Sequence, residues 1–131
     1  MIRSILAIVA GFFAIGLLAF GADAVVRSVM PQAFSASGRV ESVPVLLLMM
    51  SYVLVFAVAG CYLTARLAPS KPLKHALILG VLGLLFNIAG TIALWDTAPA
   101  WFHIVSLLLV MPAAWLGGRL REAQLTQTVA A

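Results

Sequence analysis

Long stretches without a charged side chain alternate with short charged segments along this chain. Asp, Glu, Lys and Arg are absent from four runs, residues 4–22, 45–65, 75–95 and 97–118. Each run is close to the ~20 residues that an α-helix needs to cross a hydrocarbon core of ~30 Å. Apolar and polar residues do not alternate within the runs as they do in the strands of membrane barrels. The pattern therefore predicts transmembrane helices.

The expected architecture is all-α, a polytopic bundle of four transmembrane helices in a single domain, 1–131. The helices are expected at about residues 3–27, 44–67, 73–95 and 98–119. A long external loop over residues 28–43, mobile or resting in the head-group layer, is expected to join the first two helices. Two prolines, Pro69 and Pro72, predict a tight turn between the second and third helices. A short tail, 122–131, carries no strong structural signal.

Composition explains why the surrounding solvent is lipid. Hydrophobic residues make up 64% of the chain and charged residues 9%, against about 25% charged in a typical soluble domain. A small globule cannot hide so much apolar surface from water. The net charge is +4, but the basic residues lie at the ends of the apolar runs. Such positions suit anionic lipid head groups and give no reason to expect nucleic acid as a partner.

The first run also has features of a signal peptide. Arg3 gives it a basic start, and residues 22–24 have the small-x-small form of a cleavage site. The apolar stretch is longer than the ~7–15 residues of a signal sequence. We therefore interpret it as the first membrane span.

Lysine and arginine are distributed unevenly between the two sides of the predicted bundle. One side carries Arg3, Arg66, Lys71, Lys74, Arg119 and Arg121. The other side carries only Arg27 and Arg39, together with Asp23, Glu41 and Asp96. By the positive-inside rule, this bias predicts a multi-pass protein of the bacterial inner membrane with both termini in the cytoplasm.

The two halves of the chain resemble each other. Residues 60–67 and 113–120 share an order of small residues, one aromatic, Leu, two small residues and Arg-Leu, and the spacing of Gly11 and Gly21 equals that of Gly80 and Gly90. We hypothesise that the bundle consists of two duplicated helical hairpins, related about an axis along the membrane normal.

Small residues recur at three-to-four spacing on each predicted helix, as in helices that pack closely in membranes. The second helix offers Ala57, Gly60 and Thr64. The third and fourth helices supply the residues that we select as helix-packing or pathway candidates: Gly80, Gly83, Asn87, Gly90, Thr91 and Ser106. Ordinary bundle packing is the main interpretation, and a seam between identical subunits is the alternative.

Few polar side chains are candidates for chemistry. Asp23 lies about 30 Å from Arg3 along a helix, at the external boundary, where it can pair with Arg27 one turn later or form the mouth of a pathway. His103 lies beside Trp101 in an expected aromatic belt. It is a weak candidate ligand for haem or a pigment, so no cofactor is predicted.

No residue pattern in the chain points to catalysis. A glycine-rich phosphate loop, a His/Glu zinc pattern and a nucleophile–base pair are all absent from the sequence. The single cysteine, Cys61, excludes an internal disulfide and offers no metal cluster. We therefore do not expect an enzyme.

Residues 59–69, 74–77 and 112–120 together resemble a group of small bacterial four-helix integral membrane proteins. The likeness covers the last three helices and implies no activity. Two families of similar size fit poorly: the first helix lacks the glutamate of small multidrug exporters, and the charge bias differs from that of dual-topology fluoride channels.

Two classes of function follow from these features. The first is a packing or accessory subunit, bound to other membrane subunits or to itself, in which Asn87 and Thr91 are satisfied by neighbouring helices. The second is a small oligomeric channel or carrier for a neutral or anionic solute, with a wet path near Asn87, Thr91 and Ser106. The lack of a charge in the middle of the membrane favours the first and argues against a proton-coupled pump.

Overall fold

The computed structural model describes residues 1–130, which form four long helices joined by short connections. The helices are α1 (Ile2–Val29), α2 (Val43–Leu67), α3 (Pro72–Ala93) and α4 (Ala100–Ala130). Two 3-10 turns, η1 (Pro31–Ala33) and η2 (Trp95–Thr97), lie in the connections. Each long helix is long and apolar enough to cross a membrane. The predicted fold class is thus confirmed, and the chain is a multi-pass membrane protein with four candidate spans.

Proline residues mark where the helices begin and end. Pro44 and Pro72 lie in the first turns of α2 and α3, where the missing N–H has no helical partner to lose. Helix α2 ends at Ala68, whose backbone is extended, because Pro69 disfavours helical geometry in the residue before it.

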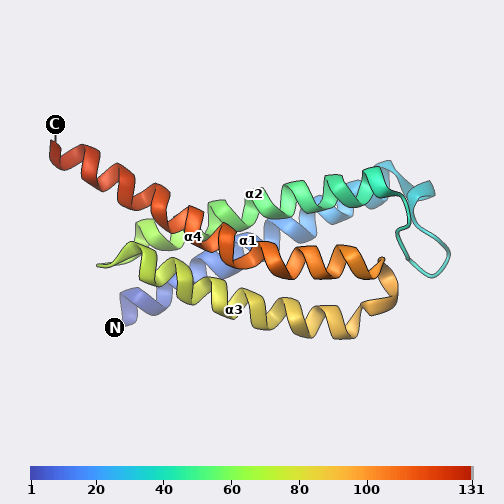
Figure 1. Ribbon diagram of the computed structural model, residues 1–131, viewed down its shortest axis with the longest axis horizontal. Coiled ribbons are helices and arrows are strands. Elements are labelled where there is room, and N and C mark those ends of the chain that lie inside the picture. The colour runs from blue at the N-terminus through green and yellow to red at the C-terminus, as the bar shows by residue number, and fades with distance from the viewer. Residues whose placement is uncertain (131) are drawn as a thin grey trace.

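Both termini lie at the same end of the bundle as the turn between α2 and α3 (Figure 1). We call this the basic end, because it carries Arg3, Arg66, Lys71, Lys74, Arg119 and Arg121. The opposite end, which we call the loop end, holds the 30–42 connection and the turn between α3 and α4. Helix α4 packs against α2 and α3, while α1 packs chiefly against α2.

Buried residues concentrate in two clusters near the two ends of the bundle. The cluster toward the basic end consists of Cys61, Ala65, Ala76, Leu79 and Ala114. Between the clusters, no residue is fully buried in four stretches, residues 12–25, 47–59, 81–93 and 104–112. The bundle is therefore tightly closed near its ends and loosely packed between them.

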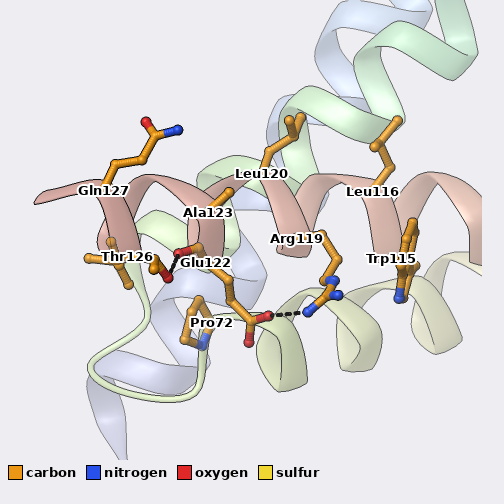
Figure 2. Close-up of a pocket in the computed structure, with 10 residues that line it drawn as sticks. Pro72, Trp115, Leu116, Arg119, Leu120, Glu122, Ala123, Thr126 and Gln127 are labelled. Atoms are coloured by element: carbon orange, nitrogen blue, oxygen red, sulfur yellow. Dashed lines mark hydrogen bonds and ion pairs between the residues drawn. The ribbon is translucent and has the colours of Figure 1, made fainter. Parts of the chain in front are cut away.

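Helix α4 continues well past its expected end near residue 119. The predicted tail over 122–131 is helical as far as Ala130, and residue 131 lies outside the described part. Arg119 pairs with Glu122 at 3.3 Å (Figure 2), and the Tyr62 hydroxyl donates a hydrogen bond to Gln124 Oε1 at 2.7 Å. Contacts between residues three apart stabilise helical turns, and the Tyr62 bond ties the extension to α2.

Removing the Tyr62 hydroxyl is expected to loosen this extension. In Tyr62→Phe, one side-chain hydrogen bond of ~0.5–1.5 kcal/mol is lost. Amide hydrogen exchange over residues 122–130 should then accelerate several-fold, as measured by mass spectrometry, with α2 itself unchanged. Gln124→Ala should give at least the same increase, because it also removes the contact with Arg121 Nη1 at 3.5 Å, and the double variant should add little to it. Unchanged exchange in either single variant would show that the hydrogen bond does not hold the helix.

The 30–42 connection is folded against the turn between α3 and α4. Phe34 and Val40 form an isolated antiparallel bridge within it. The Val40 amide donates to the Thr97 carbonyl at 2.9 Å, and Arg39 Nη1 donates to the Asp96 carbonyl at 3.0 Å. These bonds attach the first connection to the third, which differs from our expectation of a mobile or interfacial segment.

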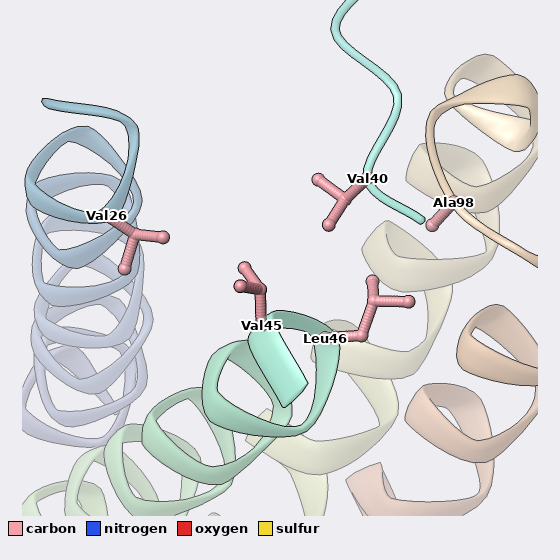
Figure 3. Packing of buried hydrophobic residues seen from close by; sticks show 5 residues of the cluster. All are labelled: Val26, Val40, Val45, Leu46 and Ala98. Atoms are coloured by element: carbon pink, nitrogen blue, oxygen red, sulfur yellow. The ribbon is translucent and has the colours of Figure 1, made fainter. Parts of the chain in front are cut away.

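Apolar packing beneath this connection forms the second buried cluster. Figure 3 shows its five members, Val26, Val40, Val45, Leu46 and Ala98, which come from α1, the connection, α2 and the turn before α4. Leu46 is only 1% exposed. The cluster therefore joins the two hairpins at the loop end.

Residues that match between the two halves of the chain occupy matching environments. The small residues of both related segments are buried: Gly60, Cys61, Thr64, Ala65, Ala113, Ala114, Gly117 and Gly118. Gly11 and Gly80 are both buried, whereas nothing lies within 4 Å of a Cβ built at Gly21 or Gly90. Burial of small residues is also what close helix packing requires, so the two duplicated hairpins stay a hypothesis.

Candidate functional site

Glycines allow the closest helix approaches in the bundle. A Cβ at Gly117 would lie 2.6 Å from the carbonyl oxygen of Val58, so α4 contacts the backbone of α2 there. A Cβ at Gly80 would lie 2.5 Å from the Cβ of Ala114 on α4. Since lipid and protein interior are equally apolar, such close approach drives association of membrane helices.

The other two glycines selected on α3 do not make close contacts. The nearest atom to a Cβ at Gly83 belongs to Val110, at 3.9 Å, and Gly90 has nothing within 4 Å. The contacts of Gly80 with Ala114 and of Gly83 with Val110 set the register of two antiparallel helices. One further turn along α3, this register places Asn87 level with Ser106 on α4.

Asn87, Thr91 and Ser106 form what we call the polar layer. All three residues are half-buried, and they lie in the loosely packed part of the bundle. Among residues 1–130, no hydrogen bond joins their side chains to another residue. An amide removed from water without a partner costs free energy. The polar layer thus has hydrogen-bonding capacity that the described chain does not use.

Thr64 contrasts with the polar layer. Its side chain is fully buried, and its hydroxyl donates to the Ala7 carbonyl of α1 at 3.0 Å. The sequence suggested Thr64 only as one member of a small-residue stripe. The structure adds that Thr64 forms a fully buried hydrogen bond between α1 and α2.

Asp23 has a partner on another helix. The Tyr52 hydroxyl of α2 donates a hydrogen bond to the Asp23 carboxylate. The expected ion pair with Arg27 is not among those formed by residues 1–130. The Arg27 guanidinium instead lies 4.6 Å from the centre of the Phe34 ring. No local spacing could have revealed Tyr52, because it lies on a different helix.

The two histidines are occupied by contacts within the chain. His103 is buried and stacks on Trp95, with ring centres 5.3 Å apart. Its Nε2 atom lies 3.2 Å from the carbonyl oxygen of Trp95. His75 Nδ1 lies 3.1 Å from the Lys71 carbonyl. The contacts of His103 join η2 to the start of α4.

One groove lies at the basic end, between the extension of α4 and the start of α3. It has a volume of about 850 Å³ and is bordered by Pro72, Trp115 and Arg119, among others (Figure 2). Arg119 lies over the Trp115 ring at 5.5 Å and also pairs with Glu122. The main cationic group of this groove is therefore already engaged.

The described residues contain no group of three or more His, Cys, Asp or Glu side chains arranged to hold a metal ion. Comparison with known protein families, with curated proteins and with solved structures finds no match to this chain. The chain therefore shares with the group that its sequence resembles only the form of a small four-helix membrane protein. No family is identified.

Proposed function

We propose that this protein is a non-catalytic packing subunit of a larger or homo-oligomeric membrane assembly. The observation that carries the proposal is the polar layer: Asn87, Thr91 and Ser106 are half-buried and their side chains form no hydrogen bond within residues 1–130. Membrane helices satisfy such side chains through neighbouring helices. A helix from another subunit, or from a second copy, would supply the missing partners at this level.

The form of the surrounding bundle agrees with a packing role. The buried polar residues Thr64 and His103 have hydrogen-bond partners within the chain. Gly90 lies beside Asn87 with nothing within 4 Å, which leaves room for close approach of another helix. The surface near the polar layer thus combines a free amide with an accessible backbone.

We place the protein in a bacterial inner membrane with the basic end in the cytoplasm. Six basic residues lie at that end, and two, Arg27 and Arg39, lie near the other. Near the loop end, the Arg27 guanidinium lies over the Phe34 ring. Arg39 donates hydrogen bonds to the Glu41 carboxylate and to the Asp96 carbonyl. The charge bias supports this orientation through the positive-inside rule.

A small oligomeric channel or carrier is the second candidate function. It rests on the same three side chains, because amides and hydroxyls on neighbouring turns can line a path for a neutral or anionic solute. The two functions differ in what covers the polar layer: another helix in the first, and water with solute in the second.

Replacing Asn87 with leucine tests the proposal. In Asn87→Leu, loss of an interhelical hydrogen bond of ~0.6 kcal/mol, at most ~1.7, should weaken assembly about threefold and up to roughly twentyfold. The measurement is native mass spectrometry of the protein extracted gently from its own membranes. Ser51→Ala is the control, because the Ser51 hydroxyl is already bonded to the Leu47 carbonyl of its own helix.

The masses distinguish the two functions. A complex with other polypeptides or copies that Asn87→Leu weakens supports the packing subunit. A homo-oligomer that is unchanged by Asn87→Leu, but whose solute flux in lipid vesicles falls, supports the channel. A monomer without bound polypeptides would contradict the packing role.

A further inference from the structure

A second groove, separate from the polar layer, runs along the outer face of α3. It has a volume of about 620 Å³ and begins at Lys71 and Lys74. Its floor continues along Leu77, Ile78, Val81 and Leu82. These residues recur at the three-to-four spacing of one helix face. Gly83 and Asn87 lie on the other side of α3, so the two features are independent.

The entrance of this groove is positively charged. Lys71 and Lys74 are exposed, and neither forms an ion pair among residues 1–130. The one carboxylate that lines the groove belongs to Glu122, which already pairs with Arg119 at 3.3 Å. The two lysines therefore give the entrance an uncompensated positive charge.

The remainder of the groove is apolar and points toward lipid. Ile78 is 39% exposed and Val81 48% exposed. From Lys74 to Leu82 the helix rises about 12 Å, which approaches half the thickness of a ~30 Å hydrocarbon core. The groove thus extends from the membrane boundary to about the depth that one leaflet occupies.

We propose that this groove is a binding site for one anionic phospholipid. The phosphate group lies between the ammonium groups of Lys71 and Lys74, and one acyl chain follows the apolar floor from Leu77 to Leu82. Charge complementarity selects the head group, because basic pockets at the membrane boundary attract anionic lipids. The apolar floor excludes a free inorganic phosphate as the natural occupant, since such an anion would leave most of the groove unfilled.

Native mass spectrometry of the full chain in detergent tests this site. Dioleoyl phosphatidylglycerol and dioleoyl phosphatidylcholine are titrated separately, so the acyl chains are identical and only the head group differs. The first phosphatidylglycerol should bind roughly thirtyfold more tightly than phosphatidylcholine, because both lysines attract the anionic head group. The double variant Lys71→Gln/Lys74→Gln should lose this preference.

The control removes the same charge from the same end but away from the groove. Arg3→Gln/Arg66→Gln should retain the preference, because neither residue lines the groove. Val81→Trp, which fills the floor without changing charge, should weaken binding of the first phosphatidylglycerol. Equal affinity for the two lipids, or equal loss of preference in both double variants, would overturn the proposal, the latter by showing diffuse attraction to the basic end.

Discussion

Replacing Gly117 with valine is expected to force α4 away from α2 and to destabilise the bundle by about 1–3 kcal/mol or more. A Cβ at this position would lie 2.6 Å from the Val58 carbonyl oxygen and 2.8 Å from the Tyr62 nitrogen. Both are backbone atoms, so no side-chain rotation can relieve the overlap. The two helices must therefore separate, and the close contacts between α2 and α4 are lost.

Unfolding in mixed detergent micelles, followed by tryptophan fluorescence and by circular dichroism, measures this loss. Gly16→Val is the matched control, because nothing lies within 4 Å of a Cβ at Gly16 on α1. The control should be near neutral, since valine has a slightly higher helix propensity than glycine. If both variants unfolded at the same denaturant concentration, tight packing at Gly117 would not be what stabilises the contact between α2 and α4.

The second large effect is expected at Leu46, under the 30–42 connection. Leu46→Ala should cost about 2–4 kcal/mol, because the side chain is only 1% exposed and its removal leaves a cavity among Val26, Val40 and Ala98. The connection lies on this cluster, so its attachment to the turn between α3 and α4 should loosen. Trypsin cleavage after Arg39 should therefore accelerate at least tenfold, because cleavage follows the population of the open form.

Leu47 provides the control for this experiment. It is the next residue, carries the same side chain and is 51% exposed. In Leu47→Ala, cleavage after Arg39 should stay within about twofold of the unmodified protein, because a lipid-facing side chain leaves no internal cavity. Similar acceleration in both variants would mean that helix propensity or detergent binding, and not the buried cluster, controls the connection.

The positions of the spans were predictable because charge is expensive in hydrocarbon. Charged residues stop each apolar run near the point where the structure ends or turns the helix, as Arg66 and Asp96 illustrate. The prolines in the turn between α2 and α3 similarly fixed its location. The exceptions are α1, which continues past Asp23 to Val29, and α4, where Arg119 and Arg121 marked the end of the apolar run but not of the helix. A helix continues into water when side-chain contacts such as Arg119–Glu122 support it.

The candidate site was only partly predictable. The sequence identified Asn87, Thr91 and Ser106 as candidates for packing or for a pathway, and the structure adds that Asn87 and Ser106 lie at one level. It also gives Asp23 the Tyr52 hydroxyl as a partner, although the local spacing favoured Arg27. Helical spacing reveals neighbours on the same helix, whereas partners on another helix depend on how the helices pack.

By itself, the sequence determined that this protein has four membrane-crossing helices, where they begin, and which end is basic. Only the tertiary structure decided which face of each helix is buried, and it separated chemically identical residues such as Gly117 and Gly16 or Leu46 and Leu47. The physical reason is that lipid and the protein interior are both apolar. Hydrophobicity therefore specifies that a helix enters the membrane, while close backbone contact and hydrogen bonding between helices decide which side it turns toward its neighbours.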